Sequence, residues 1–150
     1  MKKEKKSPQL LAVFLFSVYI CLLFYLLFFS KTYGRTMDSG YRYNLELFKE
    51  IKRFWNNRDS LGISTVITNL AGNIVAFAPF GFFLPMLWEK GRNIVRCVLL
   101  TALFSLAVEM VQLFSKVGAF DVDDILLNAI GGFVGWLCYF VIWIPFTKKK

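Results

Sequence analysis

The chain contains four apolar runs, each about 20 residues long. A run of that length crosses the hydrocarbon core of a bilayer as a single α-helix. Hydrophobic residues make up 57% of the chain, which is more than a soluble domain of this size needs. We therefore predict an all-α, multi-pass protein of the plasma membrane with four transmembrane helices. Their predicted ranges are 10–29, 66–88, 94–114 and 125–146.

A basic tail, residues 1–9, precedes the first apolar run. A cleaved signal peptide would have a shorter apolar region followed by a small-residue cleavage site. The run instead ends in Phe28-Phe29-Ser30-Lys31, which offers no such site. We expect the first run to be an uncleaved transmembrane helix.

The cations predict how the helices are oriented. Basic residues gather in the tail 1–9, in the turn at 89–96 and in the last three residues. Cytoplasmic segments carry an excess of Lys and Arg, so both termini are predicted to lie in the cytoplasm. The first external loop, residues 30–65, departs from this rule with seven cations against four anions. The formal charge of +8 resides in tails and loops, as this rule requires, so we expect no nucleic-acid partner.

Residues 43–57 of this loop carry a helical pattern. Leu47, Ile51, Phe54 and Trp55 recur at spacings of three and four, with basic residues between them. The pattern predicts an amphipathic helix lying in the membrane interface. A soluble connector packed on the neighbouring loops is the alternative.

Amide and carboxylate side chains interrupt the apolar runs, where polar groups are costly and by default mark a functional site. They are Asn69 and Asn73 in the second run, Glu109 and Gln112 in the third, and Asp123, Asp124 and Asn128 at the start of the fourth. At about 1.5 Å per residue, those inside the helices lie roughly 5–11 Å from the external boundary. Asn69 and Asn73 share one helix face, as do Asp124 and Asn128. We expect these groups to meet in one pocket beneath the external face.

Each of these residues has a structural alternative. Asp123 or Asp124 could cap the fourth helix, and Asn69 and Asn73 could bind helices together. Glu109 is harder to explain structurally, because a carboxylate in hydrocarbon must be neutralised, paired or hydrated.

The expected partners of Glu109 are Arg42, the amides of Asn73 and Asn128, or a bound cation. Gln112 is the weakest member of the set and could serve only to steady Glu109.

Small residues and prolines predict how the helices pack. Gly131 and Gly135 form a small-residue pair that would allow close contact with another helix. Pro79 and Pro85 each remove a backbone donor from the second helix. The carbonyls freed in this way must find donors on neighbouring segments.

An ordered set of segments resembles the VanZ-like family of small bacterial membrane proteins. The segments are Arg42-Tyr-Asn44, Asn69-Leu-Ala-Gly-Asn73 with Phe77, Pro79, Gly81 and Leu84-Pro85, Ser105 with Glu109 and Gln112, and Phe120-Asp-Val-Asp-Asp124 with Asn128 and Gly131-Gly132. The resemblance covers about residues 42–139. One departure is the stretch Val117-Gly-Ala-Phe120, which has no cation where the family often has an arginine, and this turns attention to Arg42.

The resemblance implies an integral membrane protein of the cell envelope, related to a namesake that lowers susceptibility to the glycopeptide teicoplanin. It does not supply a reaction. We therefore expect a role in binding or remodelling a lipid-linked envelope component, such as a cell-wall precursor, or a glycopeptide or lipopeptide at the outer leaflet. The predicted ligand-binding residues are Arg42, Asn69, Asn73, Glu109, Gln112, Asp121, Asp123, Asp124 and Asn128.

Two other functions stay open. The chain has no histidine, so a hydrolase acting on a membrane lipid or lipid phosphate would need a hydrated Mg²⁺ or Ca²⁺ held by carboxylates such as Glu109, Asp121, Asp123 and Asp124. A transporter or partner subunit is the other alternative, because broken helices and buried acids occur in transporters. We predict no cofactor beyond such a cation, no assigned catalytic residue, and leave oligomer formation open.

Overall fold

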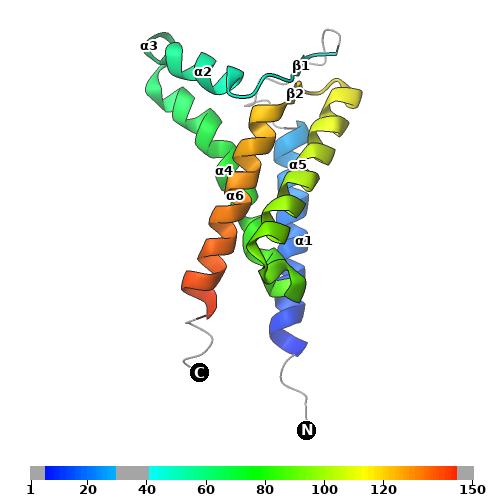
Figure 1. Cartoon of the computed structure of the whole chain (residues 1–150). Coiled ribbons are helices and arrows are strands. Elements are labelled where there is room, and N and C mark those ends of the chain that lie inside the picture. Colours follow the sequence, from blue (N-terminus) through cyan, green and yellow to red (C-terminus); the bar gives the residue numbers. More distant parts are fainter. Residues whose placement is uncertain (1–5, 30–40, 145–150) are drawn as a thin grey trace.

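The computed structural model describes residues 6–29 and 41–144, with side chains from residue 9 onward (Figure 1). Much of the predicted basic tail, residues 30–40 of the predicted external loop and the last lysines lie outside these ranges.

Four long helices form the body of the molecule: α1 (Lys6–Phe29), α4 (Ile63–Leu87), α5 (Ile94–Ser115) and α6 (Val122–Cys138). α6 continues into a π-helical turn, η3 (Tyr139–Trp143). α1, α4, α5, and α6 taken together with η3, are each long and apolar enough to cross a membrane. The predicted fold class, an all-α membrane protein with four transmembrane helices, is confirmed. The N-in, C-in orientation stays a prediction.

The short elements gather at one end of the bundle (Figure 1). They are α2 (Lys49–Asn56), α3 (Arg58–Leu61), β1 (Tyr43–Asn44) and β2 (Phe120–Asp121). β1 and β2 pair in parallel, with Tyr43 beside Phe120 and Asn44 beside Asp121. The start of α1, the end of η3 and the turn η2 (Glu89–Arg92) lie at the opposite end.

The predicted amphipathic helix at 43–57 is shorter than the pattern suggested. Its first residues pair with β2 instead of coiling, and Phe48 adopts a left-handed φ of 66°. A bulky residue rarely adopts a positive φ, and here it ends the extended segment and starts the helix. The helix α2 therefore begins at Lys49 and ends at Asn56.

Glycines bring α4 and α6 into direct backbone contact. A Cβ atom added to Gly135 would lie 1.8 Å from the carbonyl oxygen of Ala78, and one added to Gly131 would lie 2.4 Å from that of Ile74. A Cβ on Gly81 of α4 would in turn meet the backbone of Gly132 at 2.0 Å. The predicted small-residue pair, Gly131 and Gly135, is confirmed as a helix-packing surface.

The prolines of α4 are accommodated by neighbouring helices. Pro85 cannot donate to the carbonyl of Gly81 four residues earlier. That carbonyl receives the thiol of Cys97 from α5, with 3.6 Å between Sγ and oxygen. The hydroxyl of Tyr19 on α1 donates to the carbonyl of Ala76, close to Pro79, at 2.8 Å. The expectation that neighbours satisfy the broken helix is met at Gly81.

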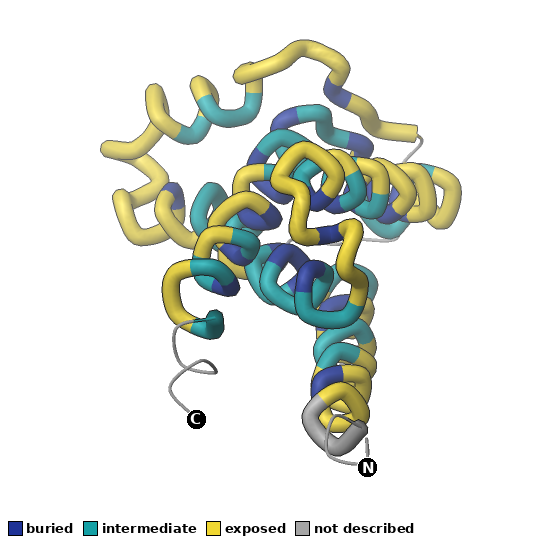
Figure 2. The backbone as a smooth tube through the Cα atoms, turned by 60° about the horizontal axis from the view of Figure 1, so that its bottom comes forward, coloured by how far each residue is buried: buried dark blue, intermediate teal, exposed yellow. Residues whose placement is uncertain are grey.

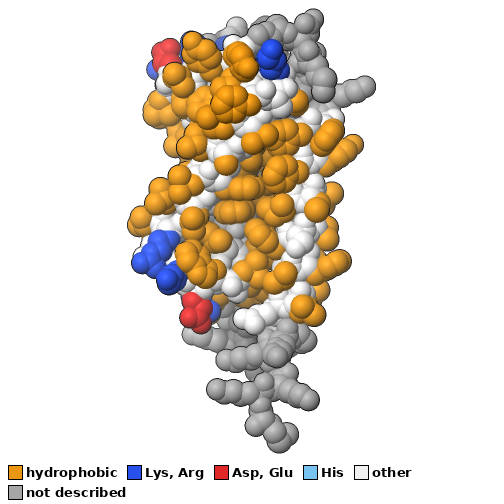
Figure 3. Space-filling view, turned by 90° about the vertical axis from the view of Figure 1, so that its right-hand side faces the viewer, with side chains coloured by type: hydrophobic (Ala, Val, Ile, Leu, Met, Phe, Trp, Pro, Cys, Tyr) orange, Lys and Arg blue, Asp and Glu red, His pale blue; other side chains and the backbone are white. Residues whose placement is uncertain are grey.

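Burial is concentrated where α4, α5 and α6 meet, whereas α1 is exposed over most of its length (Figure 2). Apolar side chains cover the middle of the face in Figure 3, and charged side chains lie towards its ends. This distribution suits a bundle whose outer surface meets acyl chains and whose ends meet water.

We predict that Gly135→Ala lowers the free energy of unfolding by about 1–3 kcal/mol, the usual cost of overpacking. Alanine is the better helix former, so destabilisation would report the α4–α6 contact and not helix propensity. Thermal unfolding in detergent, followed by circular dichroism, measures the effect. Gly118→Ala is the control, because its Cβ would make an ordinary contact of 3.4 Å with Gln112. Equal stability of Gly135→Ala and wild type would contradict the prediction.

Candidate functional site

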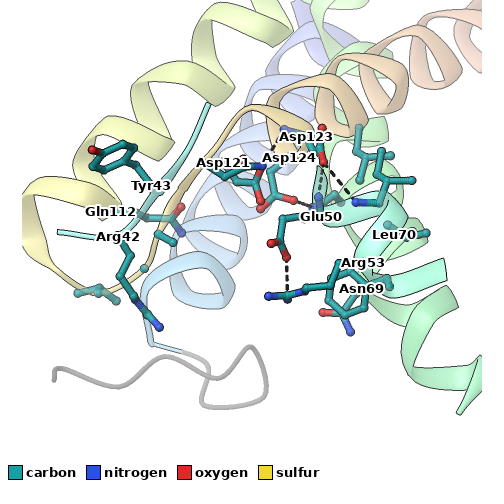
Figure 4. Close-up of a pocket in the computed structure, with 18 residues that line it drawn as sticks. Arg42, Tyr43, Glu50, Arg53, Asn69, Leu70, Gln112, Asp121, Asp123 and Asp124 are labelled. Carbon is teal, nitrogen blue, oxygen red and sulfur yellow. Dashed lines mark hydrogen bonds and ion pairs between the residues drawn. The ribbon is translucent and has the colours of Figure 1, made fainter. Parts of the chain in front are cut away.

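A cavity of about 430 Å³ opens at the end of the bundle that carries the short elements (Figure 4). It lies between α2, the first turns of α4, the end of α5 and the start of α6. Seven of the predicted site residues line it: Arg42, Asn69, Asn73, Gln112, Asp121, Asp123 and Asp124.

The other two predicted residues, Glu109 and Asn128, are not among the lining residues. They are 3% and 2% exposed and lie between α5 and α6. The expectation of one pocket shared by Asn73, Glu109 and Asn128 is therefore wrong for two of its members. Glu109 accepts the backbone N–H of Asp121, which precedes α6, and Asn128 donates to Ser105 of α5, because a polar group at this depth needs a partner inside the protein.

Asn128 contacts α5 through a single hydrogen bond to another side chain. Its Nδ2 donates to the hydroxyl oxygen of Ser105 at 2.8 Å. Its Oδ1 is buried and accepts no hydrogen bond from the part of the chain that the structure describes. Asn128 thus joins α6 to α5 rather than facing the cavity.

The Asp123 carboxylate holds the start of α2. It is 1% exposed and accepts the backbone N–H of Phe48, of Glu50 at 2.8 Å and of Ile51 at 3.2 Å. The first turn of a helix leaves such N–H groups without partners inside the helix. Asp123 therefore caps α2, not the fourth transmembrane helix as one alternative proposed.

Asp121 is the residue that caps α6. Its carboxylate accepts the N–H of Asp123 at 2.8 Å and the amide of Asn44 at 3.0 Å. Its own backbone N–H donates to Oε2 of Glu109 at 3.0 Å. The buried carboxylate of Glu109 on α5 is thereby bonded to Asp121 at the start of α6. Asp121 lines the cavity, whereas Glu109 does not.

Asp124 links α6 to α4. One of its carboxylate oxygens accepts the amide of Asn73. This bond joins two predicted site residues on facing helices, both of which line the cavity.

The remaining amides donate to backbone carbonyls. Nε2 of Gln112 donates to the carbonyl of Leu27 at the end of α1, at 3.0 Å. Nδ2 of Asn69 donates to the carbonyl of Thr65 in its own helix at 2.8 Å. Gln112 therefore fixes α1 to α5, and the expectation that it only steadies Glu109 is too narrow.

α2 contributes an ion pair to the cavity wall. The Arg53 guanidinium lies 2.6 Å from the Glu50 carboxylate. Burial raises the pKa of Glu50, the cations Arg53 and Lys49 lower it, and the carboxylates of Asp121 and Asp123 raise it further. Burial also raises the pKa of Asp121, against the hydrogen bonds from Asp123 and Asn44.

A divalent cation has no evident set of ligands here. Within residues 9–29 and 41–144, no three or more Cys, Asp or Glu side chains come together in a group that could hold a metal ion. The Asp123 oxygens already accept three backbone N–H groups. A cation at the acidic site stays a prediction without structural support from these residues.

Sequence reasoning missed Asn44, Glu50 and Arg53 as cavity residues. All three fall in the stretch assigned to an amphipathic helix surface. The bond between Asn44 and Asp121 joins residues 77 positions apart, and a pattern of neighbouring residues cannot predict such a contact. The available signal was the segment Arg42-Tyr-Asn44, which stood among the family-like motifs.

Fold and site together define a small, multi-pass membrane protein with a polar cavity at one end of a four-helix bundle. The family model described as VanZ/LLP1 matches residues 16–143. The chain belongs to this family, and the match extends over most of α1, beyond the resemblance predicted for residues 42–139.

The chain is similar to Protein VanZ of Enterococcus faecium, with 31% identity over 67 residues. The aligned region covers 45% of this chain and 41% of that protein, so the match spans less than half of its length. No solved structure matches the chain.

We predict that Asp123→Asn loosens the start of α2. The substitution puts an N–H donor in place of an acceptor that faces backbone N–H groups, which costs about 1–3 kcal/mol. Hydrogen–deuterium exchange should accelerate at Phe48, Glu50 and Ile51 and not in the middle of α5. Asp59→Asn is the control, because the Asp59 side chain is 90% exposed. Unchanged exchange at these three amides would disprove the cap.

Proposed function

We propose that the cavity binds the polar group of a lipid-linked envelope component, or of a glycopeptide or lipopeptide, at the outer leaflet. The observation that carries the proposal is the joint lining of one cavity by polar side chains from α2, α4, α5 and α6. In this proposal both termini lie in the cytoplasm and the cavity end of the bundle lies at the external face.

The size of the cavity supports a headgroup-sized ligand. Small-molecule sites occupy about 300–1,000 Å³, and this cavity, at about 430 Å³, lies near the lower limit. A sugar, a short peptide or a phosphate-bearing headgroup would fit. A whole glycopeptide would have to bind by one of its parts.

The surroundings of the cavity support a ligand that stays in the membrane. α2, α3 and the start of α4 expose Trp55, Leu61 and Ile63 along the same stretch of chain as the cationic Lys52 and Arg58. Aromatic and aliphatic side chains mixed with cations are typical of a segment at the headgroup level. A lipid-linked molecule could reach the cavity there with its acyl chain still in the bilayer.

Membership of the VanZ/LLP1 family suggests the class of ligand in this proposal. The VanZ-like resemblance implies a connection with lowered teicoplanin susceptibility, and teicoplanin binds cell-wall precursors. Both the antibiotic and its target present amides, hydroxyls and charged groups that amide and carboxylate side chains can bind. The hydrolase and transporter alternatives gain no specific support from the described residues.

We predict that Asp124→Asn and Glu109→Gln abolish any decrease in teicoplanin susceptibility that the wild-type chain confers on a susceptible Gram-positive host. The first substitution changes the cavity wall, and the second weakens the support behind Asp121. Susceptibility is measured together with the protein level in the membrane, so that loss of folding is recognised. Glu46→Gln, whose side chain is 74% exposed and outside the cavity, is the control.

Wild-type behaviour of both variants at normal abundance would remove the cavity from the proposal. Purified chain in nanodiscs provides a direct test with teicoplanin and with a lipid-linked cell-wall precursor. Absence of binding to both would refute the proposed ligand classes.

A further inference from the structure

The amides that line the cavity use their nitrogens within the protein. The nitrogen of Gln112 donates to Leu27, that of Asn69 to Thr65, and that of Asn73 to Asp124. Their side-chain oxygens accept no hydrogen bond from residues 9–29 or 41–144. Each of these three amides therefore offers a ligand its oxygen as an acceptor beside the second N–H of its nitrogen, whereas the oxygen of Asn44, the fourth amide of the lining, already accepts the N–H of Glu46.

Gln112 gives the sharpest case. Its side chain belongs to a residue only 3% exposed, yet it lines the cavity, and Figure 4 shows its amide end turned inwards. The bond from Nε2 to Leu27 fixes which end is the oxygen. Among the described residues, the one fully buried side-chain atom without a hydrogen-bond partner is Oδ1 of Asn128. Oε1 of Gln112 is therefore reachable from the cavity and can accept an N–H group of a ligand.

The charges of the wall favour the same kind of ligand. Among the described residues, four carboxylates (Glu50, Asp121, Asp123 and Asp124) and two guanidiniums (Arg42 and Arg53) line the cavity, so the formal charges of this part of the wall sum to −2. Arg53 is paired with Glu50. Arg42 forms no ion pair with another described residue, and it lies across the cavity from the aspartates in Figure 4.

We propose that the cavity selects a primary ammonium group accompanied by an anionic group. This inference rests on the proposed function and names the chemistry of its ligand. The ammonium binds against the carboxylates and the oxygen of Gln112, and the phosphate or carboxylate of the same molecule faces Arg42.

An ammonium group suits this wall because it carries a positive charge and three N–H donors and has no acceptor. A quaternary ammonium has the charge without the donors. A glycerol or sugar hydroxyl has a donor without the charge. Of these three groups, the primary ammonium alone combines the positive charge with N–H donors.

Two sources offer this chemistry: the headgroup of an ethanolamine-type phospholipid and the amine of a lipid-linked peptide. The full chain in phosphatidylglycerol nanodiscs is titrated calorimetrically with three short-chain lipids, which carry ethanolamine, choline or glycerol headgroups. A second arm uses an N-acetylated tripeptide that contains lysine, with its Nε-acetylated form as the matched control.

We expect the ethanolamine lipid, the lysine peptide or both to bind at least about tenfold more tightly than their matched controls, which corresponds to about 1.4 kcal/mol. The arm that binds identifies the source. Equal binding of ethanolamine and choline lipids, together with equal binding of the two peptides, would overturn the inference. If teicoplanin or the lipid-linked precursor binds while both ammonium arms fail, the proposed function stands and the ammonium selection falls.

We predict that Glu50→Gln weakens ammonium binding by about tenfold, since it removes one negative charge from the wall at nearly constant shape. Glu46→Gln is a matched control on the same segment. Glu46 also pairs with a cation three residues later, but it is exposed and does not line the cavity. Equal loss in both variants would show a general charge effect and contradict the assignment.

Binding should also weaken as the pH falls. An alkylammonium group stays charged because its pKa is about 10. Burial raises the pKa of Glu50, and the carboxylate of Asp123 raises it further, whereas Arg53 and Lys49 lower it. Burial also raises the pKa of Asp121, and the carboxylate of Asp123 raises it further, whereas Arg53 lowers it. Protonation removes the negative charge that attracts the ligand.

The loss of affinity should therefore begin above about pH 4, the usual pKa of carboxyl groups. Calorimetric titration of the ligand that binds, from pH 7 down to about pH 4, measures this loss. Constant affinity across that interval would contradict the assignment of these carboxylates.

Discussion

A polar group in hydrocarbon must find its partner inside the protein, and this constraint explains the hydrogen bonds that join the membrane helices to neighbouring segments. The carboxylate of Glu109 accepts the N–H of Asp121, and the amide of Asn128 donates to Ser105. The carbonyl freed by Pro85 receives the Cys97 thiol. Each bond joins two different segments, so the satisfaction of single groups also assembles the bundle.

Much of the fold was predictable from the sequence. Apolar length and helical spacing depend on neighbouring residues, and the four spans follow from them. The start of α6 is a smaller case: it begins at Val122, three residues before the predicted 125, because Asp121 caps it. The start of α2 was not predictable, since its cap, Asp123, comes from 73 positions further along the chain.

The candidate site also contains residues that the sequence predicted and residues that it did not. Asn73 and Asp124, which we expected at a shared depth, line one cavity together with Gln112. Helical phase did not distinguish a side chain facing the cavity from one facing a neighbouring helix, and Glu109 and Asn128 face the neighbour. Side chains from β1 and α2 were missed because the place of β1 depends on pairing with β2 and that of α2 on the carboxylate of Asp123.

The contacts between residues 43–56 and the start of α6 have a consequence for biogenesis. Asn44 and Asp121 are 77 positions apart, and two more spans, α4 and α5, separate them. Contacts of such sequence separation form late, because the intervening chain must be ordered first. While the ribosome is still making α4 and α5, residues 43–56 have no acceptor to dock on. The part of the cavity wall formed by residues 43–56 is thus completed only when the last membrane helix has been made. Docking of residues 43–56 therefore distinguishes the complete four-helix molecule from its precursors.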